Sequence, residues 1–178
     1  MDLRKEFFKG LDVFADTVER VGNNINLPSA CAEWDLSGVV AHERNGLLNE
    51  LLPAVTGAPA GNAPGAADAL TLADQWAVVD LQVTTAMEEA KFDDGDMAVT
   101  MAALDLFLHA WDISWGLAAA GHGERVEFDD ETLKWIDDFL QATPEEKLRV
   151  ADGFGPPTEA PDGATPTEKV MAFAGRTV

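Results

Sequence analysis

Asp105 and His109 lie four residues apart in the segment MAALDLFLHAWDISWGLAAA, and Asp112 follows three residues later. This segment is rich in Ala, Leu and Trp and has no Pro between positions 101 and 120, so it predicts one buried helix. Residues at i, i+4 and i+7 of a helix share a face, so the three side chains would project together. Burying them is costly unless a partner satisfies them. A divalent metal ion would do so, because carboxylate and imidazole suit zinc and other first-row ions.

His42 is a second histidine within a predicted helix, at the edge of an apolar stripe that contains Val39 and Leu47. If that helix faces the helix of His109, then His42, Asp105 and His109 could surround one ion and leave one position open to water. Two histidines and a carboxylate would also suit non-haem iron, so the residue types leave the metal open. The alternative for Asp105 and His109 is an ordinary helical hydrogen bond, which is common at this spacing.

Asp112 is expected to act beside the metal rather than as a ligand. It could hold an imidazole in place or polarise a bound water, as carboxylates next to metal ligands commonly do. The alternative is a partly exposed helix residue without such a role.

Four long segments with apolar residues at steps of three and four predict helices near residues 2–22, 36–52, 68–91 and 97–120. The second helix is expected to begin at a cap from Asp35 or Ser37 and to end before Pro53. Shorter helices are expected at 130–142, around TPEEKLRV and at 166–173. The inner face expected for the third helix comprises Leu70, Ala73, Ala77, Leu81, Thr84 and Met87. No alternating strand pattern is present, so the chain is expected to be all-α, most simply a four-helix bundle with short extra C-terminal helices.

The length of 178 residues fits one domain over 1–178, with a Gly/Pro/Ala linker at 56–67 and an irregular loop at 152–165. The net charge of −20, from 32 acidic and 12 basic residues, would repel a phosphate backbone, so no nucleic-acid partner is expected. No apolar run is long enough to cross a membrane, and MDLRKEFFKG lacks the apolar core of a signal peptide. A cytoplasmic protein is therefore expected, and its oligomeric state stays open, a homodimer included.

Four motifs in order carry a family resemblance. CAEWDLSGVVAHERNG resembles the Cys-x-x-Trp…His stretch of the DinB-like superfamily, and DLFLHAWDISWG resembles its acid-x-x-x-His-x-x-Asp motif. FGPP at 154–157 and the closing MAFAGR resemble C-terminal hallmarks of actinobacterial metal-binding proteins related to mycothiol-dependent maleylpyruvate isomerase. The resemblance runs from Leu3 to Arg176.

This resemblance implies a DinB-like four-helix bundle with a divalent ion, most simply zinc with nickel or iron as alternatives, held by His42, Asp105 and His109. Arg176, the basic residue of the last motif, would pair with an anionic substrate or with core carboxylates. The chain differs from the isomerase in two respects. Its acidic ligand is Asp where the isomerase has Glu, and it is too short for that enzyme's separate C-terminal domain.

Three functions follow as hypotheses. The first is a metal-dependent transferase or isomerase in which a low-molecular-weight thiol, mycothiol or bacillithiol, attacks an electrophilic substrate as thiolate. The second is a metal-dependent hydrolase, with Asp112 or Glu43 as the general base. The third is a non-catalytic protein that binds a metal or another small ligand.

Overall fold

The computed structural model describes residues 2–32, 34–59, 71–149 and 154–178, and in these residues the chain is all-α. No strand occurs among them; an isolated bridge joins Pro28 and Asp35. None of the helices described is long and apolar enough to cross a membrane. The helices are α1 (Leu3–Val21), α2 (Leu36–Gly46), the π-helical turn η1 (Leu47–Leu51), α3 (Leu52–Thr56), α4 (Leu72–Glu89), α5 (Met97–Ala119), α6 (Asp130–Ala142), α7 (Glu145–Leu148) and α8 (Pro166–Phe173).

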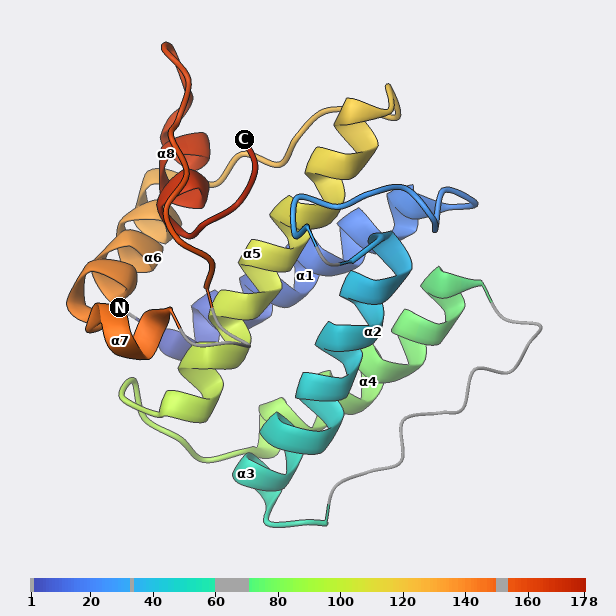
Figure 1. Cartoon of the computed structure of the whole chain (residues 1–178). Helices are drawn as coiled ribbons and strands as arrows, with labels where there is room; N and C mark the ends of the chain where they lie inside the picture. Colours follow the sequence, from blue (N-terminus) through green and yellow to red (C-terminus); the bar gives the residue numbers. More distant parts are fainter. Residues whose placement is uncertain (1, 33, 60–70, 150–153) are drawn as a thin grey trace.

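Four of these helices surround a common core (Figure 1). Each packs against two of the others, because α1 and α2 both contact α4 and α5. Their apolar stripes meet in this core, where side chains such as Phe7, Phe14, Val39 and Val83 are fully buried. The condition stated for a shared site, that the helix of His42 lies beside the helix of His109, is thereby met.

The helix α5 is buried on two sides, which explains why apolar residues surround it almost completely. One side faces α1, α2 and α4 through residues such as Leu106 and Ile113. The other side meets α6, α7 and α8 through Phe107 and Trp111. In Figure 1, α6, α7 and α8 accordingly lie on one side of α5 and α2 lies on the other.

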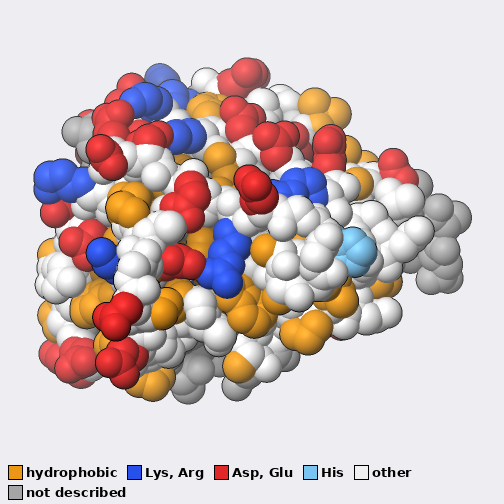
Figure 2. All heavy atoms as spheres, turned by 90° about the horizontal axis from the view of Figure 1, so that it is seen from above, with side chains coloured by type: hydrophobic (Ala, Val, Ile, Leu, Met, Phe, Trp, Pro, Cys, Tyr) orange, Lys and Arg blue, Asp and Glu red, His pale blue; other side chains and the backbone are white. Residues whose placement is uncertain are grey.

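The face in Figure 2 carries many Asp and Glu side chains, with fewer Lys and Arg and with apolar patches between them. Several of the acids cap helices: Asp2, Asp35, Asp96 and Asp129 each accept a hydrogen bond from a backbone N–H of the first turn. Asp35, one of the two caps expected for α2, is therefore confirmed.

The expectation that the second helix ends before Pro53 is wrong. The chain passes from α2 through η1 into α3, and Pro53 lies in the first turn of α3. In the wide turn of η1 the N–H of Leu52 reaches back to the carbonyl of Leu47. Pro53 then occupies a first-turn position, where the N–H that proline lacks is not needed.

The expected inner face of α4 is also wrong, apart from Met87. The buried side chains are Trp76, Val79, Val83 and Met87, whereas Leu81 is 69% exposed. Leu70, also expected on that face, lies outside the described residues. The expected and the observed sets of residues both have helical spacing. The observed set is the buried one because the ring of Trp76 packs on Phe14, with the ring centroids 4.5 Å apart.

The expected linker at 56–67 and the expected loop at 152–165 can be followed only in part. Thr56 still belongs to α3, and residues 60–67 lie outside the described part of the chain. The described portion of the loop, from 154 to 165, forms no helix. The short helices α6, α7 and α8 are present where the sequence predicts them.

The segment that leads into α2 is held against α5. The N–H of Ala30 donates to the carbonyl of Asp112 over 3.1 Å, and the carbonyl of Pro28 lies over Gly116. A Cβ at Gly116 would lie 2.2 Å from that carbonyl oxygen and 3.0 Å from Leu36 Cδ2. The absence of a side chain at Gly116 therefore sets how closely α2 and its leading segment approach α5.

We predict that Gly116→Ala destabilises the protein by about 1–3 kcal/mol, because backbone has to move to admit the methyl group. Gly46→Ala is the matched control, since a Cβ there meets nothing within 4 Å. The free energy of unfolding of Gly46→Ala should rise by roughly 0.5–1 kcal/mol, because alanine has the better helix propensity. Urea unfolding of both variants measures the difference. Equal stability of Gly116→Ala and the unchanged protein would contradict the close approach.

Candidate metal centre

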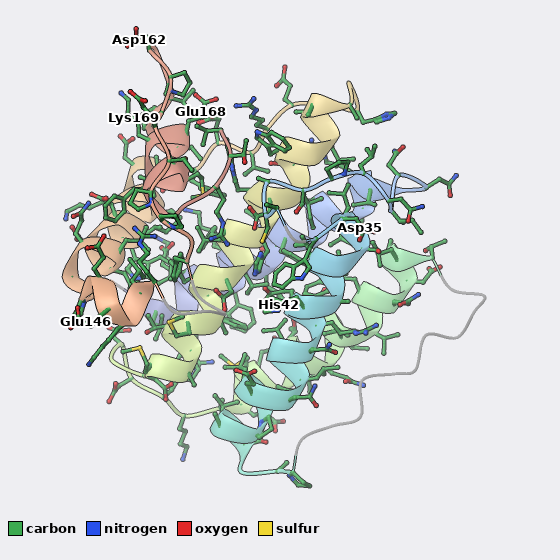
Figure 3. The ribbon with its side chains drawn as sticks, viewed as in Figure 1. Asp35, His42, Glu146, Asp162, Glu168 and Lys169 are labelled. Carbon is green, nitrogen blue, oxygen red and sulfur yellow. The ribbon has the colours of Figure 1, made fainter. Side chains whose placement is uncertain are left out.

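His42 of α2 and His109 of α5 lie against each other at the interface of the two helices. Their ring centroids are 5.0 Å apart and the ring planes meet at 76°. His109 is buried, whereas His42 is exposed at its outer edge. Figure 3 shows His42 on the side of α2 that faces α5. The labelled residues of the α8 region, Glu168 and Lys169, lie away from it.

The indole of Trp34 covers the two imidazoles. It stacks on His42 with the centroids 4.4 Å apart and lies 5.9 Å from the ring of His109. The hydroxyl of Ser29 donates to the carbonyl oxygen of Trp34 over 2.8 Å, which ties this residue to the segment held on α5. Trp34 therefore forms a wall beside the two imidazoles.

Asp112 is fully buried and binds His109. The Asp112 Oδ2 and His109 Nδ1 atoms lie 3.0 Å apart, one helical turn along α5. Burial alone would raise the pKa of Asp112, but the nearby Arg176 and His109 outweigh it and hold this pKa below its ordinary value. The ionised carboxylate accepts from Nδ1, so the Nε2 atom of a neutral His109 carries no proton. The contact expected between Asp112 and an imidazole is present, and its role toward a metal stays a prediction.

Arg176 binds the other side of the same carboxylate. Its Nε donates to Asp112 Oδ1 over 3.3 Å, and a terminal nitrogen donates to Oδ2 over 3.4 Å. A third donor reaches the carbonyl of Ala174. Gly175 lets the chain turn here with φ +83°, and a Cβ at that position would lie 2.5 Å from the carbonyl of Gly155. Of the two partners expected for Arg176, the structure contains the core carboxylate; substrate binding by Arg176 stays a prediction.

Two further carboxylates lie on the same pair of helices, and the charge of one acts on the other. Asp105, one turn before His109 on α5, is partly buried, and this burial raises its pKa although His109 and Arg176 oppose the rise. Glu43 of α2 is buried, and its pKa is raised well above the ordinary value by burial and by the charge of Asp105. The Oε2 atom of Glu43 has no hydrogen-bond partner among the described residues. A cation would stabilise the charged form of both groups.

Glu43 was expected only as a candidate base, although its position in the sequence carries a stronger signal. Glu43 lies four residues after Val39 and four before Leu47, so it stands in the apolar stripe of α2. A carboxylate in such a stripe is buried against its own preference and requires a partner.

His42 is suited to metal binding by its charge state. Partial burial lowers its pKa, and the charges of His109 and Arg176 lower it further. The neutral imidazole that results is the form that coordinates metal ions.

The separation of the two imidazole rings is compatible with one tetrahedral ion and equally with ordinary edge-to-face packing of two rings. With Zn–N distances of about 2.0–2.1 Å and a tetrahedral angle, two imidazole centroids would lie roughly 5 Å apart, and the observed separation is 5.0 Å. Across the residues that the structure describes, however, no group of three or more His, Cys, Asp or Glu side chains is arranged to hold a metal. The structure therefore brings His42 and His109 together, with Asp105 close to His109 but not in a finished ligand set.

Comparison with known proteins adds no relative: no family model, no curated protein and no solved structure matches the chain.

We predict that Arg176→Met destabilises the protein by about 3–5 kcal/mol, because it leaves the Asp112 carboxylate buried without its cationic partner. The double variant Asp112→Asn/Arg176→Met removes the stranded charge and should recover part of this loss. Urea unfolding of the single and double variants at pH 7 measures both effects. A loss below about 1 kcal/mol for Arg176→Met would contradict the importance of this ion pair.

Proposed function

We propose that the chain is a metal-dependent enzyme of DinB-like type that uses a low-molecular-weight thiol, mycothiol or bacillithiol, in an S-transfer or isomerisation reaction. The observation that carries the proposal is the pair of imidazoles of His42 and His109, whose centroids lie 5.0 Å apart, with Asp112 bound to Nδ1 of His109. The four ordered motifs that resemble the DinB-like superfamily agree with it.

The packing of the long helices supports a DinB-like four-helix bundle. Because α1 and α2 each contact α4 and α5, the four helices form a closed ring in which each has two neighbours. Bundles of this kind bind metals between facing helices, and here α2 would contribute His42 while α5 contributes Asp105 and His109.

Each residue has a distinct task in this proposal. His42 and His109 bind the ion, and Asp105 completes the ligand set while the positive charge offsets the cost of its burial. Asp112 orients His109 through Nδ1, and Arg176 keeps Asp112 ionised. When bound, the ion would hold the thiol as thiolate, the nucleophilic form. Trp34 excludes water from one side of the imidazoles.

The geometry argues against Asp112 as the general base of a hydrolase. A hydrolase needs a general base with a free carboxylate oxygen, and both oxygens of Asp112 are bound to Arg176 or His109. Glu43, the other candidate base, is buried and its pKa is raised well above the ordinary value by burial and by the charge of Asp105, so it stays the candidate base of the hydrolase alternative.

We predict that His109→Ala and His42→Ala each abolish most zinc binding, because two remaining ligands hold a divalent ion poorly. His122→Ala is the matched control: His122, the third histidine, is exposed in the turn after α5 and should leave binding unchanged. Plasma emission analysis of the protein after zinc loading and gel filtration gives the stoichiometry. Unchanged stoichiometry in His109→Ala would rule out the assignment.

Thiol binding should depend on the metal and on pH. Mycothiol would bind as thiolate and release a proton, so its affinity should rise with pH until the free thiol ionises by itself. A cobalt-loaded sample should gain a thiolate-to-cobalt charge-transfer band on adding mycothiol, and calorimetry should detect no binding to metal-free His42→Ala. Equal thiol binding to both forms would mean that the metal plays no part and would overturn the thiol mechanism. Zinc binding without thiol binding would favour a non-catalytic metal-binding protein.

A further inference from the structure

A cavity of about 450 Å³ lies on the side of α2 away from the histidines, between α2, the start of α4 and the turn after α1. From α2 it is lined by Ser37, Val40, Ala41 and Arg44, which repeat at helical spacing and share one face. His42 follows Ala41 by one residue and so points about 100° away around the helix axis. The cavity is therefore separate from the candidate metal centre, and its volume is typical of small-molecule sites.

Arg44 is the cationic side chain of this cavity, and it lacks the partners that the other arginines have. Its one hydrogen bond among the described residues is a long contact of 3.4 Å to Gln75 Oε1, and its Nε is buried without a partner. Each of the other five arginines binds a carboxylate or backbone carbonyls: Arg4, Arg20, Arg125, Arg149 and Arg176. A guanidinium has five donors arranged in a fork, so Arg44 has capacity for a further acceptor.

The other residues that line the cavity indicate which type of ligand could bind to Arg44. Ile25, Val40, Leu72 and the buried Trp76 give the cavity apolar walls. A chain of net charge −20 disfavours a multiply charged anion, and Arg44 is the single basic side chain in the lining. A ligand with a single carboxylate can form a bidentate pair with the guanidinium of Arg44. An apolar body on the same ligand can pack against the apolar side chains of the lining.

Two acidic groups near the described lining of the cavity act as helix caps, and among the described residues neither forms an ion pair with Arg44. Asp35 accepts from the hydroxyl of Ser37 and the N–H of Gly38, where it caps α2. Asp74 is bound by the N–H and the hydroxyl of Thr71 in the capping box of α4, and these bonds lower its pKa.

We propose that this cavity binds a small monocarboxylic acid with an apolar, aromatic-sized body, whose carboxylate pairs with Arg44 and whose body lies against Leu72 and Trp76. The site is independent of the metal and of the function proposed above.

The test uses 3-phenylpropionate as the probe and its uncharged amide as the matched ligand, measured by calorimetry with the full chain in the presence of a chelator. The acid should bind with a dissociation constant of about 1 mM or tighter, and the amide should bind at least roughly tenfold more weakly. Methyl resonances of Ile25, Val40 and Leu72 should shift on adding the acid.

Arg44→Met keeps the aliphatic stem and removes the charge, so it should weaken the binding of the acid roughly tenfold or more. Ala41→Leu fills the cavity without touching the charge and should also weaken binding, which gives a second variant if the first does not fold. His42→Ala should bind the acid as the unchanged protein does, so failure of the metal proposal does not affect this result. Absence of binding, equal affinity for acid and amide, or unchanged affinity in Arg44→Met or in Ala41→Leu would overturn the proposal.

Discussion

The candidate site depends on the interactions of the buried Asp112 carboxylate with His109 and Arg176. Its oxygens bind His109 Nδ1 on one side and Arg176 on the other, and its own backbone carbonyl accepts from Ala30. Three distant parts of the chain are thus fixed at one residue: the middle of α5, the C-terminal segment and the segment that leads into α2. An unpaired charge at this depth would be strongly destabilising, so folding of the C-terminal segment and ordering of His109 are energetically linked.

The double-sided burial of α5 makes this arrangement feasible. Because Phe107 and Trp111 face α6 and α8 while Leu106 and Ile113 face the other long helices, α5 has little freedom to rotate or slide. Its polar residues Asp105, His109 and Asp112 are consequently held at fixed positions inside an apolar environment. Burial raises the pKa of both Asp105 and Asp112, but only at Asp112 do the hydrogen bonds and charges of Arg176 and His109 outweigh it, so the two pKa values shift in opposite directions.

The helix α2 separates two kinds of polar environment. On the side toward α5 it presents His42 next to His109. The carboxylates of Glu43 and Asp105 interact with each other between the same two helices. On the side toward α4 it presents Arg44 above apolar walls. In a chain with 32 acidic and 12 basic residues, Arg44 has one long hydrogen bond among the described residues, whereas each of the other five arginines binds a carboxylate or a backbone carbonyl. The same helix therefore carries His42 and Glu43 toward α5 and the cationic Arg44 toward α4.

Periodicity alone determined the helical class and nearly all helix positions of this protein, because apolar residues at steps of three and four are a local property of the chain. It also placed Asp105, His109 and Asp112 on one helix, because residues at i, i+4 and i+7 share a helix face. The orientation of α4 was decided only by tertiary packing, because two apolar stripes compete there and the contact of Trp76 with Phe14 selects one. Tertiary packing likewise carried the helix past Pro53 through a π-helical turn. The approach of His42 to His109 and the pairing of Arg176 with Asp112 join residues 67 and 64 positions apart, and such contacts depend on how the helices pack rather than on local spacing.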